Sequence, residues 1–359
     1  MIDNFPNPRR MNCETGMLVN MLQYYGYQMS EQMAFGLGGG YCFVYAPFIK
    51  TPEGFIFPIF RTKPLSIVKN VFERLHLDYH EDTFGKNQDK AAAALDDLLA
   101  KDIPVGVQVN IGGLKYLRDL GEFKHYLATG SSEGTMNFNG HIICVIGEDG
   151  ENYIIADTDF RLPNDNYVKL DKLTLTKMRF APGAFTPHGK LLYLDPSNKK
   201  DVLSPNILKQ AIVAGMKEST HNMMNKFLPY FGYRGLHYFA NDLRSWPKKY
   251  NKKETDARLL KYYRWIELGG TGGAAHRGMY ADFLKESAVL FQSNVLEDCV
   301  GLMSTAADLW RKFSVDCGRF MRGEGVTLNE MADNMDEISA AEHQAFTKIK
   351  KEFLKKQKI

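Results

Sequence analysis

No stretch of this 359-residue sequence stays apolar for the roughly 20 residues that a membrane-spanning helix needs. Cysteine is scarce, with five residues and no C-x-x-C pair, so neither a disulfide framework nor a zinc finger is indicated. The charges nearly cancel, at 45 Lys and Arg against 42 Asp and Glu, which does not favour a nucleic-acid partner. The first residues, MIDNFPNPRR, also lack the apolar core of a signal peptide. We therefore expect a soluble, cytoplasmic protein with reduced thiols.

Two regions of different character meet near residue 200. Up to residue 199, helix and strand patterns are mixed, and Asp and Glu outnumber Lys and Arg by 23 to 20. From residue 200 the strand patterns almost disappear, and Lys and Arg outnumber the acids by 25 to 19. The polar, proline-containing stretch 195–200 has the composition of a boundary. The sequence predicts an α+β domain over 1–199 and an all-helical domain over 200–359.

Hydrophobic periodicity predicts the individual elements. Apolar residues at helical spacing run from Met17 to Tyr25 and stop at Gly26. The other elements expected in the first domain are helices at 64–76 and 88–101 and strands at 41–48, 55–60, 104–110, 141–146, 153–157 and 190–194. In the second domain, helices are expected at about 205–219, 255–267, 277–292, 295–318 and 338–356.

Cys13 is the first candidate for chemistry, because it lies in NCETG, where the first periodic helix begins. Free N–H groups and the partial positive charge of a helix N-terminus favour a thiolate and can hold an oxyanion. Taken alone, a lone cysteine is more often a small buried residue than a nucleophile. A catalytic Cys13 needs a histidine to activate it and a third group to orient that histidine.

A later hairpin supplies both partners. His141 opens the strand 141–146, and Asp157 closes the strand 153–157 after a polar turn. A three-residue turn centred on Asp149 places His141 directly opposite Asp157 on one face, where an imidazole can reach a carboxylate. Asp159 is the alternative orienter. A polar residue at the end of a strand and a turn-forming aspartate are each common on their own, but their combination with Cys13 is not.

The order Cys13, His141, Asp157 is that of papain-like thiol enzymes, which transfer acyl groups through a thioester. In such enzymes an amide side chain upstream of the nucleophile often completes the oxyanion hole. Asn7 lies six residues before Cys13 and is the candidate for that role, although its loop, NFPNP, is equally typical of a turn. The predicted fold class is therefore α+β, with a papain-like domain followed by a helical one.

The chain also resembles a known family. Residues 13–47 (CETGMLVNMLQYYGYQMSEQMAFGLGGGYCFVYAP), residues 103–110 and the 141–157 hairpin resemble the N-terminal domain of the butirosin biosynthesis protein H family. Residues 269–284 resemble the helical domain that often follows it. The resemblance implies a papain-like fold and transfer of an acyl group from an acyl carrier protein thioester to an amine. It also implies Cys13 as nucleophile, His141 as general base and Asp157 as its orienter.

Other positions belong to this prediction. Asn12 stands where the family often has a histidine, and Asn110 where an acidic residue is common, so the acceptor stays open. The substrate-binding candidates are Gly38, Gly39, Gly40 and Arg277. The acyl chain is expected on phosphopantetheine, with no bound cofactor and no metal. The basic residues of the second domain suit docking of an acidic acyl carrier protein.

Two alternatives remain open at this point. A cysteine peptidase or amidase could use the same three residues with water as the acceptor. A non-catalytic binding module could retain the fold. A homodimer is also left open, and the acyl chain, the pathway and the acceptor cannot be deduced from the residues.

Overall fold

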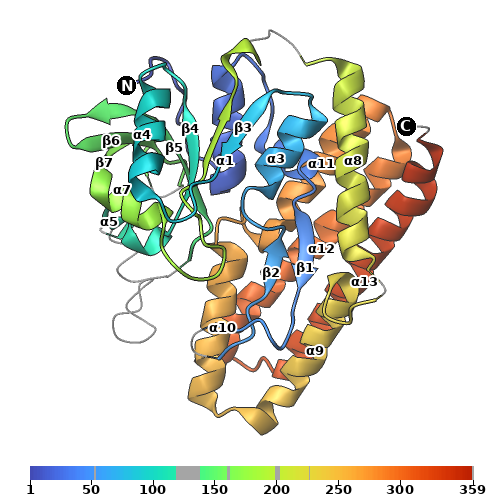
Figure 1. Ribbon diagram of the computed structural model, residues 1–359. Helices are drawn as coiled ribbons and strands as arrows, with labels where there is room; N and C mark the ends of the chain where they lie inside the picture. Colours follow the sequence, from blue (N-terminus) through green and yellow to red (C-terminus); the bar gives the residue numbers. More distant parts are fainter. Residues whose placement is uncertain (52–53, 119–137, 160–161, 199–202, 226, 358–359) are drawn as a thin grey trace. The chain divides into compact units, whose positions relative to one another are not determined.

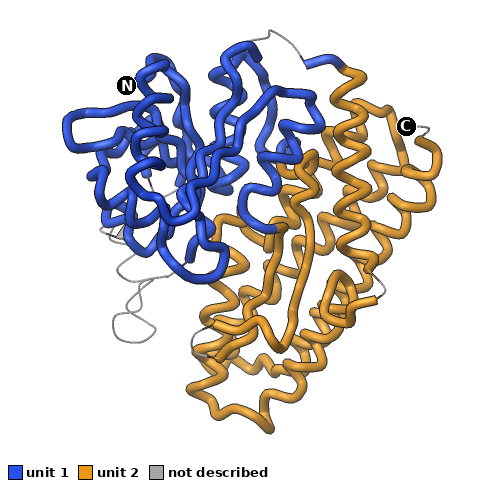
Figure 2. The backbone as a smooth tube through the Cα atoms, viewed as in Figure 1, with its two compact units in different colours: residues 1–34, 63–204 blue, residues 35–62, 205–359 orange. Residues whose placement is uncertain are grey.

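The structure is a computed structural model, and it describes residues 1–51, 54–118, 138–159, 162–198, 203–225 and 227–357. Two compact units share the chain, as Figure 2 shows. Unit 1 comprises residues 1–34 and 63–204, and unit 2 comprises residues 35–62 and 205–359. The predicted domains, 1–199 and 200–359, stay a prediction, and the compact units differ from them in grouping residues 35–62 with the C-terminal helices.

Unit 1 is built on an antiparallel six-stranded sheet with the order β3-β8-β4-β5-β6-β7 (Figure 1). Its central strands β4 and β5 are buried where they pair, because Val and Ile dominate both. The edge strand β3 carries Tyr, His, Glu and Asp and is only partly buried. The strands are β3 Tyr79–Asp82, β4 Val105–Val109, β5 His141–Asp149, β6 Asn152–Ala156, β7 Tyr167–Asp171 and β8 Leu191–Leu194.

Helices pack on this sheet around one apolar core. Helix α1 (Cys13–Tyr24) contacts β5, and the nine consecutive residues 14–22 are buried, so the helix is enclosed on every side. The core itself joins Leu95 and Leu99 of α4 to Val107 of β4 and Val145 of β5. The remaining helices are α3 Ser66–Arg74, α4 Gln88–Leu99, α5 Lys115–Arg118 and α7 Lys172–Arg179, with 3-10 turns at Ile111–Gly113 and Pro196–Asn198.

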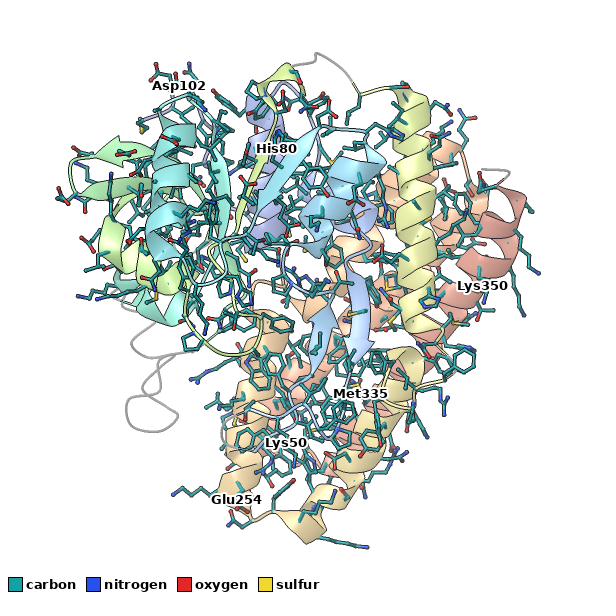
Figure 3. All side chains as sticks on the ribbon, in the orientation of Figure 1. Lys50, His80, Asp102, Glu254, Met335 and Lys350 are labelled. Carbon is teal, nitrogen blue, oxygen red and sulfur yellow. The ribbon has the colours of Figure 1, made fainter. Side chains whose placement is uncertain are left out.

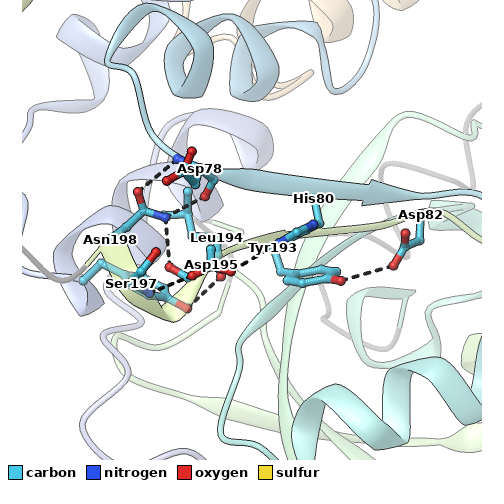
Figure 4. Close-up of polar contacts among 9 residues, drawn as sticks. Asp78, His80, Asp82, Tyr193, Leu194, Asp195, Ser197 and Asn198 are labelled. Atoms are coloured by element: carbon cyan, nitrogen blue, oxygen red, sulfur yellow. Dashed lines mark hydrogen bonds and ion pairs between the residues drawn. The ribbon is translucent and has the colours of Figure 1, made fainter.

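The polar stretch after β8 is fastened to the sheet edge (Figure 4). Asn198 donates through Nδ2 to the carbonyl oxygen of Asp78 at 2.6 Å and accepts the Asp78 N–H at 3.0 Å. Asp195 lies 3.4 Å from Nε2 of His80, which stacks on Tyr193. Residues 195–198 are therefore part of unit 1, and any linker begins after Asn198.

Unit 2 consists of helices and one two-stranded sheet of β1 (Tyr41–Val44) and β2 (Ile59–Arg61). Glu254, which Figure 3 labels, forms with Asn251 a capping box that starts α10. Thr327 and Glu330 form another that starts α13. The helices are α8 Pro205–Met223, α9 Gly232–Lys249, α10 Lys252–Glu267, α11 Arg277–Phe291, α12 Asn294–Arg322 and α13 Leu328–Lys348, followed by a π-helical turn at Ile349–Phe353. Helix α2 (Glu31–Leu37) carries the chain from unit 1 into unit 2.

The α+β class predicted from the sequence is confirmed. Every predicted helix and strand has a counterpart, although ends shift by several residues, and the last helix, expected from 338, begins at Leu328. The elements that were missed include β3, α5, β7, α7 and α9. Helix α9 contains Gly232, Gly235 and Pro247, residues that weaken a helical pattern in sequence.

Candidate active site

Cys13 is the first residue of α1 and is partly exposed, whereas the other four cysteines are buried. Asn12 caps the helix: its Oδ1 accepts the N–H groups of Glu14 at 3.0 Å and Thr15 at 3.1 Å. Among the residues that the structure describes, the N–H of Cys13 has no acceptor. The thiol thus lies at a helix N-terminus with one donor unoccupied beside it, as the sequence predicted for its position.

Position 16, the last of the NCETG sequence, requires a glycine because no side chain fits there. A Cβ placed there would lie 2.6 Å from Oγ1 of Thr158 and 2.6 Å from Cβ of Arg10. The N–H of Arg10 also donates to the Thr158 carbonyl at 3.0 Å. Glycine therefore lets the first turn of α1 approach the segment that follows β6, which carries Asp157.

His141 and Asp157 meet in the interior of unit 1. Nε2 of His141 lies 2.9 Å from Oδ2 of Asp157, and both side chains are almost completely buried. The thiol of Cys13 also acts on His141, since it is among the groups that raise the pKa of that ring. Because Nε2 faces the carboxylate, Nδ1 is the ring nitrogen left for the thiol.

The predicted hairpin register was wrong, although the contact forms. The turn pairs Asp149 with Asn152 and Gly147 with Ile154, and beyond a bulge Val145 pairs with Ile155. Ile146 is the extra residue of this bulge. The bulge restores the face on which His141 lies, so Asp157 is its diagonal neighbour rather than its direct partner.

Asp157 has two further donors that the sequence did not reveal. The hydroxyl of Tyr116 in α5 donates to Oδ2 at 2.8 Å, and the N–H of Asp159 donates to Oδ1 at 3.0 Å. Asp159 thus supports Asp157 through its backbone N–H. Tyr116 lies 41 residues away in the chain, in a four-residue helix, and no sequence pattern links the two.

These contacts set the charges of the pair. Burial alone lowers the pKa of His141, but the negative charge of Asp157, its hydrogen bond and the contact with Cys13 outweigh burial and raise that pKa well above its usual value. Burial likewise opposes the charge of Asp157, yet His141, Tyr116 and the Asp159 N–H lower the pKa of its carboxyl group. Asp157 therefore stabilises a positive charge on the His141 ring, the form that the ring takes once it has accepted a proton from the thiol.

A buried amide network holds the residues just before His141. Asn110 donates through Nδ2 to Oδ1 of Asn139 at 2.6 Å, and Gln108 donates to the Asn139 carbonyl at 2.5 Å. The carbonyl oxygen of Gly140 lies 4.0 Å from Sγ of Cys13. Asn110, where the family commonly has an acidic residue, therefore positions the chain behind the candidate base.

Asn7, the predicted oxyanion donor, is buried and engaged elsewhere. Its Nδ2 donates to the carbonyl oxygen of Asn166 at 2.9 Å, and its backbone carbonyl accepts the Asp165 N–H at 2.9 Å. These bonds fix the N-terminal segment to the loop before β7. A role for Asn7 in an oxyanion hole stays a prediction.

The predicted substrate-binding residues belong to unit 2. Arg277 is completely buried, and its three nitrogens donate to Glu342 and to the Ala275 carbonyl at 2.7–3.2 Å. Gly39 has a positive φ of 63°, and a Cβ there would lie 2.6 Å from the Glu218 carboxylate. Gly38 and Gly40 flank this turn. The contacts of Arg277 account for a role in the core of unit 2, and substrate contact by these residues stays a prediction.

No group of three or more His, Cys, Asp or Glu residues within the described ranges is arranged to hold a metal ion. None of the described helices has the length and apolar character needed to cross a membrane. The predictions about cofactors, acyl carrier protein and a homodimer stay predictions.

Cys13 at the start of α1 and the buried His141–Asp157 pair lie in one α+β unit, the arrangement of a papain-like cysteine enzyme. Residues 12–158 match the family model described as Butirosin biosynthesis protein H, N-terminal, and residues 173–349 match the model described as Domain of unknown function (DUF4872). The match over residues 12–158 confirms the resemblance to the butirosin biosynthesis protein H family seen in the sequence.

Two further comparisons complete the picture. No curated protein sequence matches the chain. Among solved structures, the chain is similar to the crystal structure of a putative C39-like peptidase from Bacillus anthracis, with a TM-score of 0.33 and 15% identity. That match covers 54% of this chain and 94% of the other. A likeness at this TM-score carries no argument about the function of the chain.

Proposed function

We propose that this protein transfers an acyl group from an acyl carrier protein thioester to an amine through an acyl-Cys13 intermediate. The observation that carries the proposal is the chain of contacts from the thiol of Cys13 through His141 to Asp157. The match of residues 12–158 to the butirosin biosynthesis protein H family supports a carrier-bound thioester as the donor.

The first half-reaction forms the acyl-enzyme. His141 takes the thiol proton of Cys13 on Nδ1, and Asp157 stabilises the resulting imidazolium. The thiolate attacks the thioester carbonyl carbon, and the displaced electron pair moves to the carbonyl oxygen. The unoccupied N–H of Cys13 can donate to that oxyanion. Collapse of the intermediate breaks the bond to the carrier sulfur, and His141 protonates the departing thiolate.

The second half-reaction transfers the acyl group. An amine attacks the carbonyl carbon of acyl-Cys13, and His141 accepts one of its protons. Collapse then breaks the bond to Sγ, releases the amide and regenerates the Cys13 thiolate beside the imidazolium. Water in place of the amine would give hydrolysis, so the acceptor distinguishes a transferase from an amidase or peptidase.

The lysines of residues 248–253 are the proposed contacts for an acidic carrier protein. Two of them are already paired within unit 2: Lys249 with Asp242 at 2.9 Å and Lys252 with Asp256 at 2.6 Å. Lys248 and Lys253 are exposed at the end of α9 and the start of α10. These two lysines are therefore the ones to reverse in charge when carrier docking is tested.

The experiment that tests the proposed function combines the full-length protein, an acyl carrier protein thioester and a panel of amines, with products separated by mass spectrometry. Formation of an amide that depends on protein and amine supports a transferase. Release of the free acid alone at every amine concentration would replace it with a hydrolase. No consumption of any thioester or peptide would contradict both and favour a binding module.

A further inference from the structure

The backbone N–H groups on both sides of Cys13 have acceptors. A helix N-terminus normally leaves several backbone N–H groups without partners. Here the Asn12 side chain accepts two of them, those of Glu14 and Thr15, and the Gly16 N–H makes the first ordinary helical bond to the Asn12 carbonyl. The N–H of Cys13 lies directly before these three in the chain.

Glu31, the first residue of α2, occupies the donors on the other side. Its carboxylate accepts the N–H of Met11 at 2.9 Å and the N–H of Asn12 at 2.7 Å. It also accepts the hydroxyl of Thr15 at 2.8 Å. Glu31 is only 5% exposed, so these three bonds satisfy a carboxylate that would otherwise be costly to bury.

Among the described residues of this segment, these bonds leave one backbone donor without an acceptor, the N–H of Cys13. Within the described chain, the N–H groups of Met11, Asn12 and residues 14–16 all have acceptors, and that of Cys13 alone has none. An oxyanion formed on a carbonyl bound to Sγ therefore meets one free donor, with the positive end of the α1 dipole behind it. Glu31 and Asn12 together fix where that donor points.

We infer that Glu31 is a positioning residue that orients the N–H of Cys13 as the oxyanion donor of the site. The inference rests on the proposed nucleophile, Cys13, and on no particular acceptor. Glutamine at position 31 would keep one acceptor oxygen, but its amide NH2 would face a backbone N–H or the Thr15 hydroxyl. The segment 11–13 would then have to turn to restore its hydrogen bonds, and the Cys13 N–H would move with it.

Two reactions of the same thiol separate this role from general support of the fold. Acylation by a thioester builds negative charge on a carbonyl oxygen, so its rate depends on the oxyanion donor. Alkylation by iodoacetamide displaces iodide at a saturated carbon and forms no oxyanion. Both reactions need the Cys13 thiolate, and both fail if unit 1 unfolds.

The experiment measures both rates in the full-length protein by intact-mass spectrometry, with a small aryl thioester and iodoacetamide as probes. In Glu31→Gln, we expect acylation to slow by about 10- to 100-fold, comparable with or below the loss of one oxyanion donor, while alkylation changes by less than about threefold. Glu14→Gln is the matched control. Glu14 is also a buried carboxylate, but it accepts the N–H groups of Leu65, Ile67 and Val68 at the start of α3. Its acylation-to-alkylation ratio should equal that of the wild type.

The remaining outcomes are also decisive. Parallel loss of both rates in Glu31→Gln, or loss of neither, would overturn the inference. If Glu31→Gln is insoluble, Glu31→Asp keeps the charge but cannot reach all three donors, and it should show the same selective loss. If the wild type reacts with the aryl thioester but never with a carrier thioester, the proposed function fails while this test stands. If it reacts only with iodoacetamide, the inference itself is contradicted.

Discussion

Two buried ion pairs, one in each unit, show what separates a reactive site from a structural one. In unit 2, Arg277 and Glu342 are fully buried, and Trp310 donates to the same carboxylate at 3.1 Å. Every nitrogen of Arg277 is used, and its guanidinium also lies over the ring of Tyr41. The pair is closed on all sides, so its contacts serve to join α11, α12 and α13.

The pair in unit 1 is open at one end. Asp157 is saturated by His141, Tyr116 and Asp159, yet His141 uses only one ring nitrogen on it. The other faces a thiol that is partly exposed. Burial of charge alone therefore does not mark a catalytic site. What marks it is a buried ionisable group with one hydrogen-bonding atom left over, directed at an atom that a substrate can reach.

The largest loss of activity should come from replacing Cys13, the residue beside the free ring nitrogen of His141. Cys13→Ala removes the nucleophile, so acyl transfer should fall by about 10⁴-fold or more, the scale seen when a catalytic nucleophile is deleted. Cys144→Ala is the control, because burial raises the pKa of the Cys144 thiol and the residue lies on the same strand as His141. Its turnover, measured by product formation, should stay within a few-fold of wild type. An equal loss of turnover in both variants would contradict the assignment of Cys13 as the nucleophile.

Replacing the carboxylates of Asp157 and Glu342 by amides should affect different properties: mainly catalytic rate for the first and mainly folding stability for the second. Asp157→Asn weakens the partner of His141 and should lower the rate by roughly 10²–10⁴-fold with a smaller change in melting temperature. Glu342→Gln leaves Arg277 as a buried, poorly compensated charge and should cost about 3–5 kcal/mol of folding stability. Calorimetry and turnover on both variants check this. If Glu342→Gln lost turnover at temperatures where it is fully folded, its pair would not be purely structural.

The two pairs should also differ in their response to pH. The pKa of folded His141 is raised above the usual 6.5, so its contribution to stability is complete below about pH 6.5 and is lost as pH rises through the raised value. The pKa of folded Asp157 is lowered, so its contribution is present above about pH 3.8 and is lost as pH falls through the lowered value. The difference in melting temperature between wild type and Asp157→Asn should therefore shrink above about pH 6.5.

Arg277 supplies the contrast for that measurement. Burial lowers the pKa of Arg277, but Glu342 outweighs it and raises that pKa further, so the guanidinium stays charged between pH 6.5 and 9. The difference in melting temperature between wild type and Glu342→Gln should stay constant over that range. A parallel decline in both series would mean that His141 is not the titrating group.

The smallest effect should come from the outermost donor to Asp157. Tyr116→Phe removes one hydrogen bond of a typical net worth of about 1 kcal/mol, so acylation should slow by about threefold to tenfold. Tyr25→Phe is a suitable control, since Tyr25 is a buried tyrosine whose hydroxyl bonds the Leu194 carbonyl at 3.1 Å. A rate change as large in Tyr25→Phe would reassign the effect to lost stability.

The parts of this site that depend on neighbouring residues could be predicted from the sequence, and the contacts between residues far apart in the chain could not. Cys13 at a helix start and the His141–Asp157 hairpin follow from periodicity and turn residues, which act over a few positions. The bulge at Ile146 was not predictable, because only Gly147 marks it and a glycine there is equally compatible with a plain turn. The predicted register was wrong, but the bulge keeps His141 on the face of Asp157, and the two side chains then meet as diagonal neighbours.

Tyr116 and Glu31 could not be found from sequence for a different reason. Their partners are separated from them by 41 residues and by 16 to 20 residues, respectively, and no period or motif encodes such contacts. The edge strand β3 and helix α9 were missed because their own residues argue against them: polar side chains in the strand, and Gly232, Gly235 and Pro247 in the helix. Packing in the folded chain overrides these local preferences.

The most direct test locates the acyl group. The full-length protein is exposed briefly to a thioester with no amine present, quenched in acid and digested, and the modified peptide is sequenced by mass spectrometry. Cys42, Cys144, Cys299 and Cys317, whose thiols burial makes less acidic, serve as internal controls. We predict an acyl group on Cys13 alone, lost in His141→Ala. An acyl group on another residue, or on Cys13 at an equal rate in His141→Ala, would contradict this assignment.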